Sequence, residues 1–173
     1  LPADYHSAQR QHAHLPLVFM LVLTQMSVGA FVVEQFLSSS LGWTLPGEFN
    51  TGRVVHLGAG LCLALLGMGA AVLHLGRPRY AYRAWIGLRT SWLSREILAF
   101  GLFAFMAAVY AGVAGLEFVA AGVSSGVERG LGAAAAASGI FGVVCSVMIY
   151  ADTRRIFWAG PPTSVKFFGT ALI

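Results

Sequence analysis

Long apolar runs separated by short polar connections dominate the pattern of this chain. Four runs, at residues 17–37, 54–75, 97–117 and 130–150, are mostly apolar, and a fifth begins at Val165. A helix needs roughly 20 consecutive apolar residues to cross the hydrocarbon layer of a bilayer. The pattern therefore predicts an all-α fold, a polytopic bundle of transmembrane helices with four complete spans and the start of a fifth.

Composition strengthens this prediction. Hydrophobic residues make up 57% of the 173 positions and charged residues only 10%, whereas soluble domains average about 45–50% and about 25%. We expect residues 1–16 to form a polar linker and residues 17–173 to form one transmembrane domain. Because the chain begins at Leu1 rather than at Met and stops inside an apolar run, we also expect a piece of a longer polypeptide, truncated at its C-terminal end.

The cations are divided unevenly between the two membrane faces. The N-terminal segment and the connections after the second and fourth spans share one face, which holds nine of the eleven Lys and Arg residues. Only Arg53 and Arg129 lie on the other face, whose loops are predicted at residues 38–53 and 122–130. The acids predicted on that face are Glu34, Glu48, Glu117 and Glu128. Because basic residues in short loops favour the cytoplasm, we expect a cytoplasmic N-terminus in a bacterial inner membrane.

The net charge of +4 therefore indicates anionic lipid headgroups rather than nucleic acid. Within the spans, Thr24, Gln25 and Ser27 form a polar stripe that we expect to face other helices. The second and fourth spans are rich in small residues, which let helices approach closely, so both are predicted to be interior to the bundle. Cys62 and Cys145 are too far apart for a cluster site and are expected to be small buried hydrophobes, and no metal site is expected.

The connection after the second span, LHLGRPRYAYRAWIGLRTSWLSREI, holds five arginines. Its aromatic residues recur at helical spacing and predict a short helix that lies in the membrane interface. Gly76 and Pro78 end the second span, which leaves His74 in its last turn. Ser94 is the expected N-cap of the third span, with Glu96 in its first turn.

Two residues of this connection are candidates for chemistry. His74 and Glu96 fall at the same depth, at the ends of consecutive antiparallel helices. A quinol that is oxidised needs a hydrogen-bond partner for its hydroxyl and a route for its protons, and histidine (unperturbed pKa about 6.5) and a carboxylate suit these tasks. The competing interpretations are structural: His74 could bind the last helix carbonyls, and Glu96 could complement the positive helix end.

Three stretches carry a family resemblance: HLPLVFMLVLTQMSVGAF, HLGRPRYAYRAWIGLRTSWLSREI and GPPTSVKFFGT. They resemble the membrane anchor subunit of dimethyl sulfoxide reductase and its relatives, and His-Leu-Gly-x-Pro followed by Ser-x-Glu-Ile is the most specific part. The resemblance implies about eight spanning helices, so roughly three would be missing here. It also implies an anchor that oxidises menaquinol and passes electrons to iron–sulfur and molybdopterin partners.

By this resemblance the quinol-binding candidates are His74 and Glu96, with Arg77 beside them. The expected docking residues for the iron–sulfur partner are Arg79, Arg83, Arg89, Arg154 and Arg155. No metal or haem is expected in this chain, because the iron–sulfur clusters and the molybdopterin of such a complex would reside in the partner subunits. The polar linker before the first span resembles the segment that would join the anchor to a preceding iron–sulfur domain in a fusion protein.

Three alternatives stay open. A b-type cytochrome would need two axial ligands, for which His14 and His74 share a face. A transporter would place charged or broken-helix features near the midplane of the bilayer, whereas the polar residues here gather at one rim. A purely structural anchor is compatible with every feature of the sequence.

Overall fold

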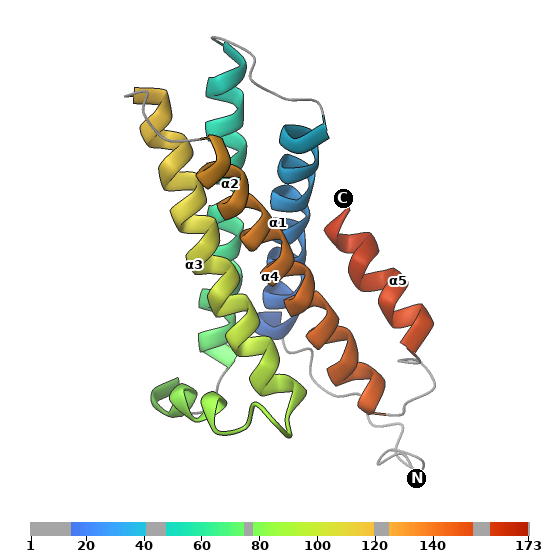
Figure 1. Cartoon of the computed structure of the whole chain (residues 1–173). Helices are drawn as coiled ribbons and strands as arrows, with labels where there is room; N and C mark the ends of the chain where they lie inside the picture. The colour runs from blue at the N-terminus through green and yellow to red at the C-terminus, as the bar shows by residue number, and fades with distance from the viewer. Residues whose placement is uncertain (1–14, 41–47, 75–77, 120–124, 154–159, 173) are drawn as a thin grey trace.

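The computed structural model describes residues 15–40, 48–74, 78–119, 125–153 and 160–172, and every long element among them is a helix (Figure 1). The elements are α1 (Leu15–Ser40), α2 (Glu48–His74), the 3-10 helix η1 (Pro78–Trp85), α3 (Trp92–Val119), α4 (Ser125–Asp152) and α5 (Gly160–Ala171). The four long helices are apolar and long enough to cross a membrane. The predicted all-α fold class with four spans is therefore confirmed, and α5 is a fifth, shorter helix.

The helices α1 to α4 lie side by side, and consecutive ones run in opposite directions (Figure 1). We call one end of the bundle the η1 end, because it holds η1, the start of α1, and the neighbouring ends of α4 and α5. We call the opposite end the Arg53 end, since Arg53 lies in the second turn of α2 there. The arrangement agrees with the predicted grouping of the second and fourth connections at one end. Which membrane face that end occupies stays a prediction.

The contact between α1 and α2 is close because small and polar residues line it. The Ser27 hydroxyl on α1 donates a 2.7 Å hydrogen bond to the Gly60 carbonyl of α2. A Cβ at Gly67 would lie 2.7 Å from the Thr24 side chain, so glycine is needed there. Thr24, Gln25 and Ser27 are all buried, which confirms that this polar stripe faces other helices.

Helix α4 lies deepest in the bundle. Of its most apolar stretch 56% is buried, compared with 22% for α2, so the predicted interior position is confirmed for α4 and wrong for α2. The small residues of α2 do not share one face: Gly60 and Gly67 contact α1, whereas Gly69 is exposed. On α4, by contrast, Gly139 and Gly142 both receive side chains of neighbouring helices.

Aromatic side chains fill the core between these helices. Phe31 on α1 meets Phe103 on α3 edge to face, with ring centroids 5.6 Å apart, and lies 6.2 Å from the Tyr110 ring. Edge-to-face pairs stabilise a core beyond the apolar area that they bury. Of the two cysteines, Cys145 is buried as predicted, but Cys62 is exposed because it lies on the outward face of α2.

Four of the helices extend further than predicted. Helix α1 continues to Ser40 and α2 begins at Glu48, so most of the predicted 38–53 loop is helical. Helix α4 begins at Ser125, within the predicted 122–130 loop, and α5 begins at Gly160 rather than near Val165. Charged and small residues in these first turns lower local hydropathy without preventing helix formation. As a result, charged residues that were expected in loops lie on helices.

Replacing Gly139 tests whether the close approach of α4 is required. A Cβ there would lie 2.8 Å from Val28 and 3.0 Å from Phe103, so we expect Gly139→Leu to destabilise the fold by about 1–3 kcal/mol. Gly112→Leu is the matched control, because a Cβ at Gly112 meets no atom within 4 Å. Thermal unfolding in detergent measures both. Equal midpoints would contradict the packing described for α4.

Candidate functional site

The start of α3 positions the acidic candidate at the η1 end. The Ser91 hydroxyl accepts a 3.4 Å hydrogen bond from the Ser94 backbone N–H, so Ser91 is the N-cap and the prediction of Ser94 is wrong. Because α3 begins at Trp92, Glu96 lies beyond the first turn. Helix-end electrostatics fall off within that turn, so Glu96 is poorly placed to complement the helix end.

Glu96 points into the bundle instead. It is only 4% exposed, and its Oε1 accepts a short hydrogen bond from the Ser146 hydroxyl on α4. Among the described residues, Ser146 is the one hydrogen-bond partner of the Glu96 carboxyl, so no described residue binds its Oε2. Ionisable side chains in membrane spans are costly and are usually functional, so this buried carboxyl is the strongest candidate at the η1 end.

The surroundings of Glu96 come from α4 and α5. Cys145 and Tyr150 on α4 are close enough to interact electrostatically with its carboxyl. The Tyr150 ring in turn meets Phe167 of α5 edge to face, with centroids 5.3 Å apart. Helix α5 therefore packs against Tyr150, a residue of α4 that interacts with the Glu96 carboxyl.

Arg95 fastens the preceding connection to α3. Its Nε donates to the Leu88 carbonyl at 2.9 Å and its Nη2 to the Arg89 carbonyl at 3.2 Å. The guanidinium also stacks over the Trp92 ring, 4.2 Å from the centroid. These contacts tie residues 88–92 to the turn that carries Glu96, so the connection and the carboxyl hold a defined relative position.

The connection holds a short helix, the 3-10 helix η1, which ends earlier than the predicted one and lies across the end of the bundle (Figure 1). Its position in the membrane interface stays a prediction. Its aromatic side chains Tyr82 and Trp85 are exposed, and so are the predicted docking residues Arg83 and Arg89. Arg83 lies over the Tyr80 ring at 5.8 Å. An exposed surface of cations and aromatic rings therefore lies at the same end of the bundle as Glu96.

Several other predicted site residues lie wholly or partly outside the described part of the chain. His74 is the last residue of α2, at the same end of the bundle as Glu96, as expected, but its side chain lies outside the described residues. The same holds for the Arg79 side chain and for all of Arg77. Arg154, Arg155 and the alternative haem ligand His14 also lie outside the described residues. Their predicted roles stay predictions.

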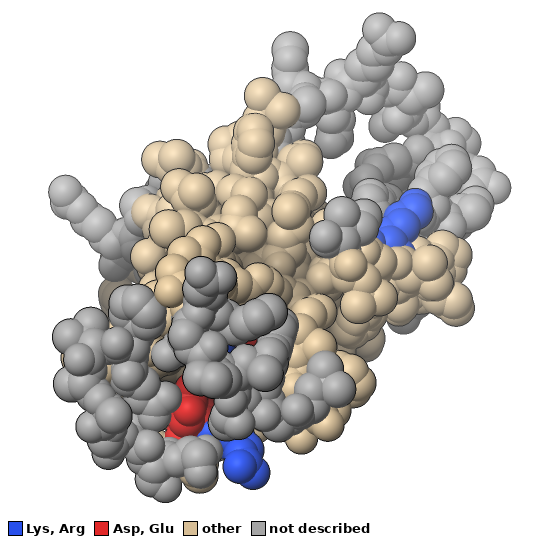
Figure 2. Space-filling model, turned by 90° about the horizontal axis from the view of Figure 1, so that it is seen from above, with Lys and Arg blue, Asp and Glu red and all other residues tan. Residues whose placement is uncertain are grey.

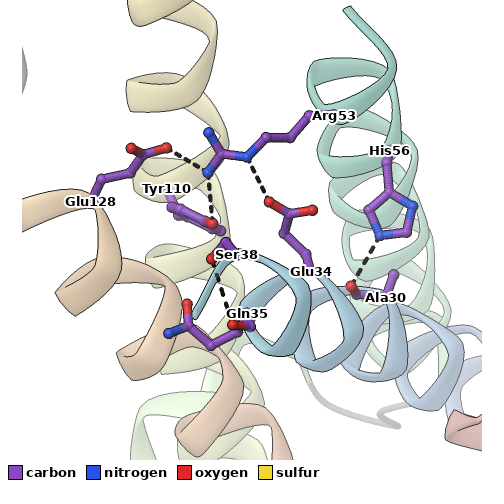
Figure 3. Close-up of polar contacts among 8 residues, drawn as sticks. All are labelled: Ala30, Glu34, Gln35, Ser38, Arg53, His56, Tyr110 and Glu128. Atoms are coloured by element: carbon purple, nitrogen blue, oxygen red, sulfur yellow. Dashed lines mark hydrogen bonds and ion pairs between the residues drawn. The ribbon is translucent and has the colours of Figure 1, made fainter. Parts of the chain in front are cut away.

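At the Arg53 end the structure assembles a charged cluster that was not predicted (Figure 3). Arg53 of α2 pairs with Glu34 of α1 through Nε and with Glu128 of α4 through Nη2, both at 2.5 Å. Its Nη2 also donates to the Tyr110 hydroxyl of α3 at 2.9 Å. Beside the cluster, His56 Nε2 lies 3.0 Å from the Ala30 carbonyl. We call Glu34, Arg53, Tyr110 and Glu128 the Arg53 cluster.

The Arg53 cluster takes one side chain from each of the four long helices. Glu34 is 2% exposed, so the pairing satisfies a carboxylate that the bilayer could not solvate. Seen from this end, red and blue atoms lie together at one side of the molecule, further blue atoms lie apart from them, and most of the other described surface is tan (Figure 2). A sequence signal existed, because Glu34 lies inside an apolar run and must find a cation. Arg53 and Glu128 were instead assigned to loops.

A comparison with known protein families shows which family the chain belongs to. The family described as "DMSO reductase anchor subunit (DmsC)" matches residues 9–173, nearly the whole chain. The chain belongs to this family. The DmsC resemblance expected from the sequence motifs is thereby confirmed, and the four apolar helices agree with a multi-pass membrane anchor.

Two relatives illustrate the range of the DmsC family. The C subunit of sulfite dehydrogenase from Allochromatium vinosum is 36% identical over 132 residues, which cover 71% of this chain and 40% of that protein. The C component of the anaerobic dimethyl sulfoxide reductase of Haemophilus influenzae is 38% identical over 100 residues, 56% of this chain and 33% of that protein. The chain thus spans less than half the length of either relative. No solved structure matches it significantly.

Removing the central cation tests the Arg53 cluster. Arg53→Ala leaves Glu34 buried without its partner, so we expect a loss of about 3–5 kcal/mol in the free energy of unfolding. Arg129→Ala is the control, because Arg129 is an exposed cation at the same end, next to Glu128. Thermal unfolding in detergent compares the two. If both variants unfold at the same temperature, the cluster does not stabilise the bundle.

Proposed function

We propose that this anchor oxidises a menaquinol at the η1 end and passes the electrons to an iron–sulfur partner of a molybdopterin oxidoreductase. The observation that carries the proposal is the buried Glu96 carboxyl, held by α4 and lying beside a connection rich in arginine and aromatic residues. Membership of the DmsC family supports the same reading, as does the name of the dimethyl sulfoxide reductase relative.

The residues at the η1 end suit a quinol. When bound, a quinol supplies two electrons and two protons as it becomes a quinone. The Oε2 of Glu96, which no described residue binds, can accept a hydrogen bond from a hydroxyl and then its proton. His74, at the end of the antiparallel neighbour α2, is placed to serve a second hydroxyl, as the family resemblance implies. Arg77 is proposed to support the same site.

The partner is proposed to dock on the exposed cations of this end. Arg83 and Arg89 are exposed in the described connection, and Arg79, Arg154 and Arg155 are assigned to the same surface from the sequence. Complementary charge steers association and fixes the orientation of the docked partner. With the electron acceptor held there, electrons leave the site toward the partner's clusters, while Glu96 and His74 handle the protons.

The described charges do not favour the alternatives. A transporter would place charged groups near the midplane, whereas the charges described on α1–α4 lie toward the two ends of the bundle. A purely structural anchor gives no reason to bury a carboxyl at the η1 end, where water and lipid headgroups are close. The quinol site explains that burial, because a shielded acid can exchange protons with a bound hydroxyl.

Neutralising Glu96 tests the function. In the assembled complex, Glu96→Gln should lower quinol-dependent reduction of the partner at least about a hundredfold, because general acid–base groups contribute about that much. Asp152→Asn is the control, an exposed acid at the same end of the bundle. Copurification of the partner and its reduction by dithionite should remain normal in both variants. Unimpaired quinol turnover in Glu96→Gln would overturn the proposed function.

A further inference from the structure

Ser146 is the one described residue that binds Glu96, and it lies fifty positions away in the sequence. It is fully buried, on the face of α4 that packs against α3. Its hydroxyl reaches two acceptors, the Glu96 Oε1 and, at 3.2 Å, the Gly142 carbonyl one turn earlier on α4. A hydroxyl has a single proton to donate, so it can serve only one of these acceptors fully at a time.

This geometry lets Ser146 bind both charge states of the carboxyl. An ionised carboxylate only accepts, so the Ser146 hydroxyl donates to it. When Oε2 takes the proton, Oε1 becomes the carbonyl oxygen of a neutral carboxyl and still accepts the hydrogen bond of the Ser146 hydroxyl. The bond between Glu96 and Ser146 therefore persists through a change of protonation, and neither helix needs to move.

A second serine of α4 shows what an ordinary buried serine does here. The Ser138 hydroxyl, also buried, bonds the carbonyls of Ala134 at 2.7 Å and Ala135 at 3.0 Å in its own helix. Among the described residues it joins no other helix and contacts no ionisable group by hydrogen bond. Serines in membrane helices commonly satisfy themselves in this way. Ser146 departs from that pattern by donating across to a carboxyl.

We propose that Ser146 is a positioning residue for the quinol reaction, which holds the Glu96 carboxyl in one orientation before and after it accepts a proton. This inference rests on the proposed function, since it assigns Ser146 a role through Glu96. Catalytic groups must be held within a fraction of an ångström, and supporting hydrogen bonds supply that accuracy. The role differs from packing, because removing one hydroxyl from α4 leaves the core otherwise filled.

Paired serine variants test the inference in the assembled complex. Ser146→Ala should lower kcat for menaquinol oxidation about tenfold, while Ser138→Ala should leave it unchanged. Infrared difference spectra of quinol oxidation supply a second readout that a packing role would not move. The band of the Glu96 carboxyl, identified by its loss in Glu96→Gln, should change frequency in Ser146→Ala and not in Ser138→Ala.

The possible outcomes separate the two proposals. If Ser146→Ala matches Ser138→Ala in rate and in the infrared band while Glu96→Gln is inactive, the role of Ser146 is refuted and the quinol function stands. A fall in rate without a change in the band would also refute it, because a general packing defect would then be the cause. If Glu96→Gln oxidises quinol at a normal rate, the proposed function fails and the role of Ser146 fails with it.

Discussion

Polar groups inside a bilayer must find partners on neighbouring helices, because hydrocarbon offers none. In this chain that constraint produces two sets of polar contacts between helices, one at each end of an aromatic core. We call them the two interhelical ties. At one end Arg53 joins side chains from all four long helices, and at the other Glu96 of α3 is bound by Ser146 of α4. Glycine and serine contacts between the ties bring the helices close enough for both to form.

The two ties differ in how completely their groups are used, and this difference suggests separate tasks. Arg53 contacts a partner on each of the other three helices, so three described residues share its Nε and Nη2. Glu96 has one hydrogen bond from a described residue and lies beside an arginine-rich connection that Arg95 fastens in place. The first arrangement stabilises the bundle, and the second leaves a carboxylate oxygen for a ligand at the end proposed to face the partner.

The sequence predicted the spans well, because long apolar runs have few alternatives in a membrane protein. It failed where charged residues occupy the first turns of helices: Arg53 and Glu128 lower local hydropathy and were assigned to loops, which hid their cluster. The interior position predicted for α2 was wrong, because small residues were counted without asking which face they share. Glu96 was singled out as a candidate from its place at a span end and stays one, but Ser146 was not singled out, since nothing in its own segment distinguishes it from Ser138.

The central claim is that quinol binds at the Glu96 end of the bundle, and photoaffinity labelling tests it most directly. An azidoquinone analogue would be activated in membranes that contain the assembled complex, and the labelled peptides would be identified by mass spectrometry. The account predicts labels in the first turns of α3 and the last turns of α4, suppressed by excess menaquinol. Competitive labelling confined to peptides around the Arg53 cluster would contradict it.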